Sequence, residues 1–283
     1  MIPAAFDYLR ATSLDDALAA LADPDAKVIA GGLSLLPMMK LRLARPTLLV
    51  DVAPLGLSGV SAADGQGTRV GALTTYRDLL QPDASARLGA ISECAARVGD
   101  LQVRNVGTVG GGIAHADPAS DVAAGVLAMG ARLVLRSPGG TREVDAADFF
   151  LGPFTTALEQ QEILVELLVP PARPGEGSAY VSVEDPASGY PIAGAAVRAR
   201  REGDRIVECS IGITGATSHP FRARDVEELV VQRGEVPSLT EVRDALGDLH
   251  VLGDVHAGGD YRLHLAAVVV TRAAGTASER GAR

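Results

Sequence analysis

The stretch Lys27–Ser34 (KVIAGGLS) decides the fold, because an apolar segment runs directly into two glycines. Its first half predicts a short strand, residues 35–41 a helical turn or short helix, and Thr47–Val52 a further strand. Upstream, Ser13 is a good helix N-cap, with two aspartates in the first turn that favour the positive end of a helix. The first 55 residues therefore predict an α/β unit.

A second glycine run, Thr108–Gly112 (TVGGG), lies in another α/β unit and continues into Ala114–Asp121 (AHADPASD). We expect it to precede a helix that starts near Asp121. Around it, the pattern predicts strands over 69–72, 131–136 and 162–169, and helices over 75–80 and 88–98.

Successive glycines let a backbone approach a pyrophosphate closely, and their N–H groups can form an anion-binding concavity. Neither run is a G-x-G-x-x-G fingerprint or a G-x-x-x-x-G-K-[ST] phosphate loop. Each run alone leaves two interpretations open, a plain turn or a phosphate cradle. Two such runs after β-like segments favour a dinucleotide bound between two subdomains.

The clearest linker is Pro170–Gly177, where Pro and Gly interrupt regular structure. Beyond it, 192–200 and 205–214 predict paired strands about the turn Glu202–Asp204. Helices are expected over 222–232, 238–246 and 261–274, with a frayed polar tail from Gly275. The predicted organisation is α+β, with subdomains at 1–55 and 56–172 and a C-terminal domain at 178–275.

The composition of the 283 residues, 47% hydrophobic and 22% charged, is that of a globular protein. A net charge of −9 without a basic stripe argues against nucleic acid as a partner. Two distant cysteines, Cys94 and Cys209, cannot supply the four thiolates of an ordinary iron–sulfur cluster. The N-terminus lacks signal-peptide features, and the apolar stretch Leu265–Val270 is too short to span a bilayer, so a cytoplasmic location is expected.

Residues 30–43, ending in Leu49-Val50-Asp51, resemble the first FAD loop of the molybdenum hydroxylase flavoproteins. These are the medium subunits of aerobic carbon monoxide dehydrogenase and the corresponding part of xanthine dehydrogenases. Residues 104–111 and 114–121 are similar to the second FAD loop of that family. The segments 186–190 and 254–262 also resemble family segments, in the same order, so the resemblance covers nearly the whole chain.

The resemblance implies a two-subdomain FAD-binding domain of the vanillyl-alcohol oxidase (PCMH) type, followed by a C-terminal sheet-and-helix domain. FAD would lie extended in the cleft, with its pyrophosphate against both glycine runs. Matched residue by residue, it implies FAD contacts from Ala30, Gly31, Gly32, Leu33, Ser34, Thr108, Val109, Gly110, Gly111, Gly112, Asp117, Asp121, Leu164 and Tyr190. Among these, Asp121 would contact the flavin, Leu164 would lie near the adenine end, and Tyr190 close to the isoalloxazine.

Three positions depart from the family pattern and bear on how tightly FAD is retained. Gly112 replaces a frequent Asn, Ser182 replaces a frequent Lys, and Leu33 replaces a commonly polar residue. Two further positions have simpler interpretations. Asp121 can serve as a helix N-cap, alone or together with a flavin contact. His115 beside Asp117 offers only two ligands, which do not make a metal site.

The resemblance implies the FAD subunit of a molybdenum-dependent hydroxylase. Electrons would come from a large molybdopterin subunit through the [2Fe–2S] clusters of a small subunit, and would leave to a quinone or NAD⁺. No catalytic acid–base set and no metal ligands are predicted in this chain. Two alternatives remain open: a stand-alone FAD oxidoreductase, and a degenerate scaffold subunit with weak or no flavin.

Overall fold

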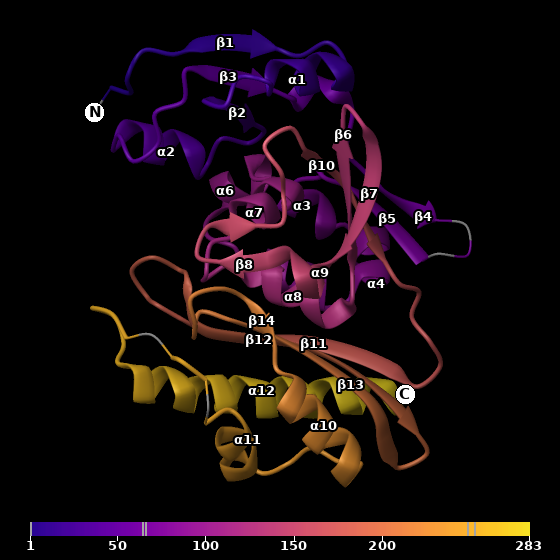
Figure 1. Cartoon of the computed structure of the whole chain (residues 1–283). Coiled ribbons are helices and arrows are strands. Elements are labelled where there is room, and N and C mark those ends of the chain that lie inside the picture. Colours follow the sequence, from indigo (N-terminus) through magenta and orange to yellow (C-terminus); the bar gives the residue numbers. More distant parts are fainter. Residues whose placement is uncertain (1, 64, 66, 248, 252) are drawn as a thin grey trace.

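The computed structural model describes residues 2–63, 65, 67–247, 249–251 and 253–283. In the view of Figure 1 the chain forms three stacked parts: an N-terminal sheet at the top, a second sheet with most of the short helices in the middle, and a C-terminal sheet with a long helix beneath it. The α+β architecture predicted from the sequence is confirmed.

The N-terminal part is a parallel three-stranded sheet in the order β1-β3-β2. Ser13 caps the first helix, since its hydroxyl accepts a hydrogen bond from the Asp16 N–H at 3.0 Å. Ala17, Leu18 and Val50 are buried between that helix and the sheet. The elements are β1 (Asp7–Arg10), α1 (Leu14–Ala20), β2 (Ala26–Ile29), α2 (Leu35–Lys40), β3 (Leu48–Asp51) and a 3₁₀ turn (Ala53–Leu55).

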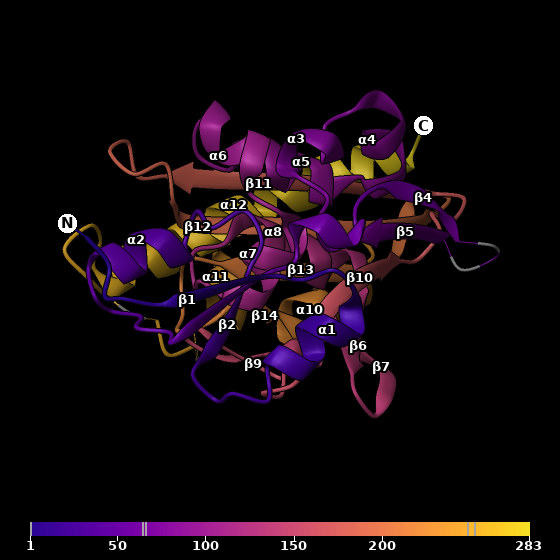
Figure 2. The ribbon, with the colours of Figure 1, turned by 90° about the horizontal axis from the view of Figure 1, so that it is seen from above.

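The middle part is an antiparallel five-stranded sheet in the order β4-β5-β10-β6-β7. In Figure 2, which looks down on the N-terminal sheet, the helices of the middle part lie beside and behind the N-terminal strands. Its strands are β4 (Val60–Ala63), β5 (Gly67–Gly71), β6 (Arg132–Ser137), β7 (Gly140–Asp145) and β10 (Ile163–Val169), with a small hairpin of β8 (Phe150–Gly152) and β9 (Thr155–Thr156). Its helices are α3 (Tyr76–Leu79), α4 (Pro82–Leu88), α5 (Ala90–Arg97), α6 (Leu101–Val106), α7 (Val109–His115), α8 (Asp121–Met129) and α9 (Ala146–Phe149).

The second glycine run precedes a helix that starts at Asp121, as predicted, but it also forms a helix of its own, α7, which was not predicted. Thr108 is the N-cap of α7, and its hydroxyl accepts a hydrogen bond from the Gly111 N–H at 3.2 Å. Glycine is required here by close packing: a Cβ on Gly110 would lie 2.5 Å from the Cβ of Ala72. The neighbouring prediction for Asp121 is also wrong in detail, since Ser120 is the N-cap of α8 and Asp121 is its first residue.

The C-terminal part is a four-stranded antiparallel sheet, β11-β12-β13-β14, with α12 packed along it (Figure 1). The predicted pairing about Glu202–Asp204 is confirmed, since Glu202 lies opposite Arg205. Its strands are β11 (Glu176–Glu184), β12 (Pro191–Glu202), β13 (Arg205–Thr214) and β14 (Phe221–Arg222), and its helices are α10 (Arg224–Arg233), α11 (Leu239–Ala245) and α12 (Gly259–Gly281). The boundaries predicted at 55, 172 and 178 stay predictions.

The expectation of a frayed tail from Gly275 is wrong, because α12 continues to Gly281. Ala277 and Ser278 are buried, and Arg201 donates a 2.8 Å hydrogen bond to the Ser278 hydroxyl. Arg280 forms an ion pair with Glu93 of α5 at 2.5 Å. Ser278 and Arg280 therefore bind back to the body of the protein, which holds the end of α12 in place. Within the described residues, no helix is long and apolar enough to cross a membrane.

Helix α8 joins the middle and C-terminal parts. It packs on β12 and β13, and Gly212 permits the contact, since a Cβ there would lie 2.2 Å from the Ala124 carbonyl oxygen. Every residue of α8 is buried. This accounts for its sequence, which beyond Asp121 is apolar throughout and lacks the polar stripe of a surface helix.

Candidate functional site

A cleft of about 780 Å³ lies between the N-terminal and middle parts. The first glycine run, with residues 30–35, forms one wall, and α6, α7 and the start of α8 form the other. The turn Ser188–Tyr190 of the C-terminal part closes one end. Both glycine runs singled out in the sequence thus meet at one cleft, although Gly32 and Thr108 are 76 positions apart.

The first run presents free backbone donors to the cleft. The N–H groups of residues 31–35 find no hydrogen-bond acceptor within the described parts of the chain. Gly32 has φ +71°, a left-handed conformation that favours glycine. Consecutive N–H groups aimed at one hollow are the recurring geometry of phosphate binding in proteins. This run therefore matches the predicted cradle.

The second run has a different role, because its N–H groups are occupied. Val109 N–H donates to the Thr74 carbonyl at 2.9 Å, and Gly110 N–H donates to the Ala72 carbonyl at 2.9 Å. The N–H groups of Gly111 and Gly112 donate to the hydroxyl and carbonyl oxygens of Thr108. The run contributes a flat wall without side chains, which lets a ligand approach closely. The sequence suggested close approach to a ligand and anion binding for both runs. In the structure the free N–H donors belong to the first run, and the second run offers close approach alone.

Gly112 is required by its neighbour Tyr76. A Cβ on Gly112 would lie 2.0 Å from the Tyr76 hydroxyl oxygen, and both residues line the cleft. Tyr76 is otherwise buried, and burial raises the pKa of its phenol. The departure from the frequent Asn thus has a physical reason: a hydroxyl from α3 already occupies the space beside residue 112.

Asp121 lies at the deep end of the cleft and is 5% exposed. Its carboxyl accepts a 2.6 Å hydrogen bond from the hydroxyl of Tyr180, which comes from β11 of the C-terminal part. Burial raises the pKa of Asp121 to about 7, although the Tyr180 hydrogen bond acts in the opposite direction. A carboxyl that titrates near neutral pH can hold or release a proton beside a ligand in the cleft.

Tyr190 reaches the cleft from a tight turn and is 51% exposed. Asp185 organises this turn, because its carboxylate accepts hydrogen bonds from the N–H groups of Ala187 and Ser188. The same carboxylate contacts His256 Nδ1 at 3.1 Å. The two late segments that resemble family motifs, 186–190 and 254–262, are therefore neighbours in the fold.

The structure places most of the predicted contacts on the cleft wall. These are Ala30, Gly31, Gly32, Leu33, Ser34, Thr108, Gly111, Gly112, Asp117, Asp121 and Tyr190. Val109, Gly110 and Leu164 are not part of the wall: Val109 is fully buried, Gly110 packs on Ala72, and the Leu164 side chain is buried in the core of the middle part. Ser182 is also outside the wall, and its hydroxyl donates to Glu184 at 3.1 Å. The assignment of these residues to FAD contacts stays a prediction.

Two tyrosines of the site were missed by the sequence analysis. Tyr76 carried no signal beyond its position in a short predicted helix. Tyr180 occupies a buried position of a strand, which predicts core packing but not a carboxyl partner. Each acts through a hydroxyl that meets a residue far away in the sequence, and one sequence alone gives no such pairing.

Comparison with known proteins identifies the class. Residues 4–172 match the family model described as the FAD binding domain in molybdopterin dehydrogenase, and residues 178–277 match the CO dehydrogenase flavoprotein C-terminal domain. The glyceraldehyde dehydrogenase medium chain of Sulfolobus acidocaldarius is 37% identical over 82% of this chain and 83% of its own length. The carbon monoxide dehydrogenase medium chain of Hydrogenophaga pseudoflava is 35% identical over 99% of both chains.

A solved structure of carbon monoxide dehydrogenase from Hydrogenophaga pseudoflava, which lacks the Mo-pyranopterin moiety of its cofactor, superposes with a TM-score of 0.93. It covers 99% of both chains at 37% identity. The fold and the cleft thus define a FAD-binding oxidoreductase subunit. The chain belongs to the molybdopterin dehydrogenase flavoprotein family, as a medium subunit, and its cofactor is FAD.

The residues present fit that cofactor. The five free N–H groups of residues 31–35 suit a pyrophosphate, and the glycine wall at 111–112 leaves room beside it. Lys27 also lines the cleft and supplies a positive charge. Tyr190 offers an aromatic ring at one end of the cleft. The charged group of its turn, the Asp185 carboxylate, is already bound by the N–H groups of Ala187 and Ser188.

Proposed function

We propose that this chain relays electrons within a molybdenum hydroxylase complex. A small subunit with [2Fe–2S] clusters would deliver electrons that a large molybdopterin subunit has taken from substrate, and a quinone or NAD⁺ would receive them. Support comes from the medium-chain relatives, whose names place them in multi-subunit dehydrogenases. The cytoplasmic location predicted from the sequence is kept as part of this proposal.

One observation carries the proposal at the level of the site: the row of unoccupied N–H donors from Gly31 to Leu35 on the wall of the cleft. Bound FAD supplies the redox chemistry, since its ring system accepts and donates electrons. The residues of the chain bind and orient it: residues 31–35 hold the phosphates, and Tyr190 lies beside the ring. Asp121 can hold a proton at the deep end of the cleft.

The test uses the chain alone and then the reconstituted complex. The purified chain is expected to show the visible absorbance of FAD, yet to oxidise no aldehyde, purine or carbon monoxide. Addition of the small and large subunits should produce substrate-dependent bleaching of the flavin. Substrate oxidation by the chain alone would favour the stand-alone oxidoreductase. A colourless chain that still assembles with its partners would favour the scaffold alternative.

A further inference from the structure

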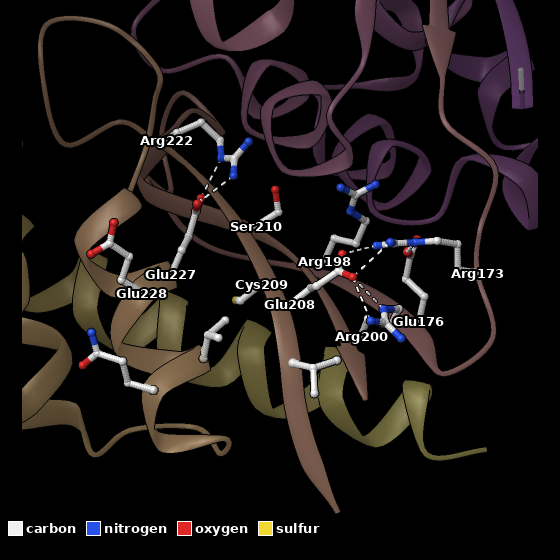
Figure 3. A pocket seen from close by; sticks show the side chains of 13 residues that line it. Arg173, Glu176, Arg198, Arg200, Glu208, Cys209, Ser210, Arg222, Glu227 and Glu228 are labelled. Carbon is white, nitrogen blue, oxygen red and sulfur yellow. Dashed lines mark hydrogen bonds and ion pairs between the residues drawn. The ribbon is translucent and has the colours of Figure 1, made fainter. Parts of the chain in front are cut away.

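A second cavity, of about 540 Å³, lies in the C-terminal part between the sheet and α10 (Figure 3). None of the residues that line it also line the FAD cleft. Four arginines and four glutamates surround it. The arginines are Arg173, Arg198, Arg200 and Arg222, and the glutamates are Glu176, Glu208, Glu227 and Glu228.

Strand alternation explains why charged side chains gather here. On β12, Val197 and Ala199 point into the core against α12, so Arg198 and Arg200 project from the opposite face. In the register of β12 and β13, Arg200 lies opposite Glu208, whereas Arg198 lies opposite Ser210. Arg200 therefore has an acidic cross-strand neighbour, and Arg198 has a neutral one.

The other arginines of the cavity are ion-paired. Arg222 binds Glu227 through two hydrogen bonds of 2.6 and 2.7 Å. Glu208 accepts hydrogen bonds from both Arg173 and Arg200. These carboxylates are fully engaged: Glu227 also accepts the Ile211 N–H at 2.7 Å, and Glu208 is shared by two guanidinium groups.

Arg198 is the exception. It forms no ion pair with any described residue, and its one hydrogen bond runs from Nη1 to the Met129 carbonyl at the end of α8, at 3.2 Å. Figure 3 shows it between Arg222 on one side and Arg173 on the other. Burial lowers the pKa of Arg198; among the nearby charges Glu176 and Glu208 oppose this effect, whereas Arg173 and Arg222 add to it. Arg173 and Arg222 are neutralised by their glutamates, whereas Arg198 has only the Met129 carbonyl as a partner among the described residues and keeps its other N–H donors available to an anion.

We propose that Arg198 anchors a binding site for a small oxyanion, a phosphate or a carboxylate group, at the junction of α8 and the C-terminal sheet. The guanidinium fork suits two oxygens of such a group, and the Ser210 hydroxyl lies in register beside it as a further donor. The carboxylates of the cavity equal its arginines in number, and Glu176 is itself paired with Arg173 at 3.2 Å. They favour a small anion over a polyanion such as nucleic acid.

The test follows the melting temperature of the FAD-loaded chain. Inorganic phosphate or malonate is titrated against chloride at constant ionic strength, so that the two arms distinguish phosphate from carboxylate. The wild-type temperature should rise and saturate in at least one arm, while the flavin absorbance stays constant. Arg198→Gln should weaken that response at least about tenfold, because a charge-assisted pair is lost. Arg87→Gln, an exposed arginine of α4 outside the cavity, is the matched control and should respond like wild type.

Ser210→Asp tests the same site without removing the arginine. A carboxylate opposite Arg198 would form the ion pair that the strand register offers, so the variant should fold and lose its response to added anion. An equal response in wild type, Arg198→Gln and Ser210→Asp would overturn the proposal. So would a wild-type melting temperature that neither phosphate nor malonate raises.

Discussion

The two glycine runs look alike in the sequence but differ in what their backbones do. Residues 31–35 leave their N–H groups without acceptors, whereas the N–H groups of residues 109–112 are all bound within the protein. The first run offers positive partial charge to a ligand, and the second offers space. Glycine content alone therefore does not identify a phosphate cradle, because the deciding property is whether the N–H groups are free.

The difference comes from what lies beside each run. The second run lies against the end of β5, where the Ala72 and Thr74 carbonyls accept two of its N–H groups. The first run leaves β2 at the edge of its sheet and turns into α2, and the N–H groups at the start of a helix have no partner within the helix. A negative charge placed at the two runs should therefore have unequal effects on FAD binding.

Gly32→Asp should weaken FAD binding about a thousandfold, an effect of about 4 kcal/mol, because it adds a negative charge and a strained conformation beside the free donors. Gly32→Asn adds similar bulk without charge and should weaken binding less. The readout is FAD affinity measured by flavin fluorescence.

The matched pair is Gly111→Asp and Gly111→Asn on the second run. These two variants should lose similar amounts of affinity, since no free N–H groups hold a phosphate there. A charge-specific loss at Gly111 as large as that at Gly32 would remove the contrast between the runs.

Asp121, nine residues beyond Gly112, should make stability depend on pH. Its pKa is raised from 3.8 to about 7, so between these values the folded state binds more protons than the unfolded state. The free energy of unfolding should therefore fall as pH rises from about 4 to 7 and stay level above, with a loss of about 2–3 kcal/mol between pH 5 and pH 8. Urea denaturation of the apo protein at a series of pH values measures this change in the free energy of unfolding.

Asp121→Asn should remove this part of the pH dependence. Tyr180→Phe should extend it to higher pH, because the hydrogen bond that favours the carboxylate is lost. An unchanged slope in Asp121→Asn would assign the titration to another group.

The contact between Gly112 and Tyr76 predicts an unusual rescue. Gly112→Ala should destabilise the protein and weaken FAD binding, because the new Cβ meets the Tyr76 hydroxyl. Tyr76→Phe removes that oxygen, so the double variant should recover about 1–2 kcal/mol relative to the sum of the single effects. Urea denaturation of the four proteins measures the coupling. Strict additivity would show that the hydroxyl does not restrict residue 112.

The smallest effect is expected at Ser182, two residues from Tyr180 on the same face of β11. Ser182→Lys should place an ammonium group near Glu184 and Asp121, lower the pKa of Asp121 by about one unit and raise the reduction potential of the flavin. Ser182→Met, of similar length without charge, is the control. Equal potentials in the two variants would show that charge at this position does not reach the ring.

The sequence predicted the fold where local signals agreed. The strands around Gly31, the hairpin about Gly203 and the family itself are confirmed. Helix α7 was missed because three consecutive glycines disfavour a helix on propensity, and only the Thr108 cap and tight packing on Ala72 overcome this. The helical tail was missed because Arg280 and Ser278 bind partners distant in sequence.

For the site, the sequence predicted residues of both walls of the cleft, but not which glycine run has free N–H donors. Which N–H groups are free depends on acceptors such as Thr74 and Ala72, which adjoin the second run only in three dimensions. The Tyr180–Asp121 bond likewise joins residues 59 positions apart. A match to a family motif shows which residue types stand at which positions. Their hydrogen-bond partners follow from the packing of the whole chain.

The contact of Gly31 with the opposite wall has a mechanical consequence. A Cβ on Gly31 would lie 2.3 Å from the Val106 carbonyl oxygen, so the two walls touch there through backbone alone. At the other end, the cleft is closed by the half-exposed Tyr190 on a turn. The first contact sets the width of the cleft through backbone atoms, whereas at the second end a side chain lies on a turn that Asp185 holds by hydrogen bonds. Any side chain at position 31 would therefore push the two walls apart, whereas a smaller side chain at position 190 would leave their spacing unchanged.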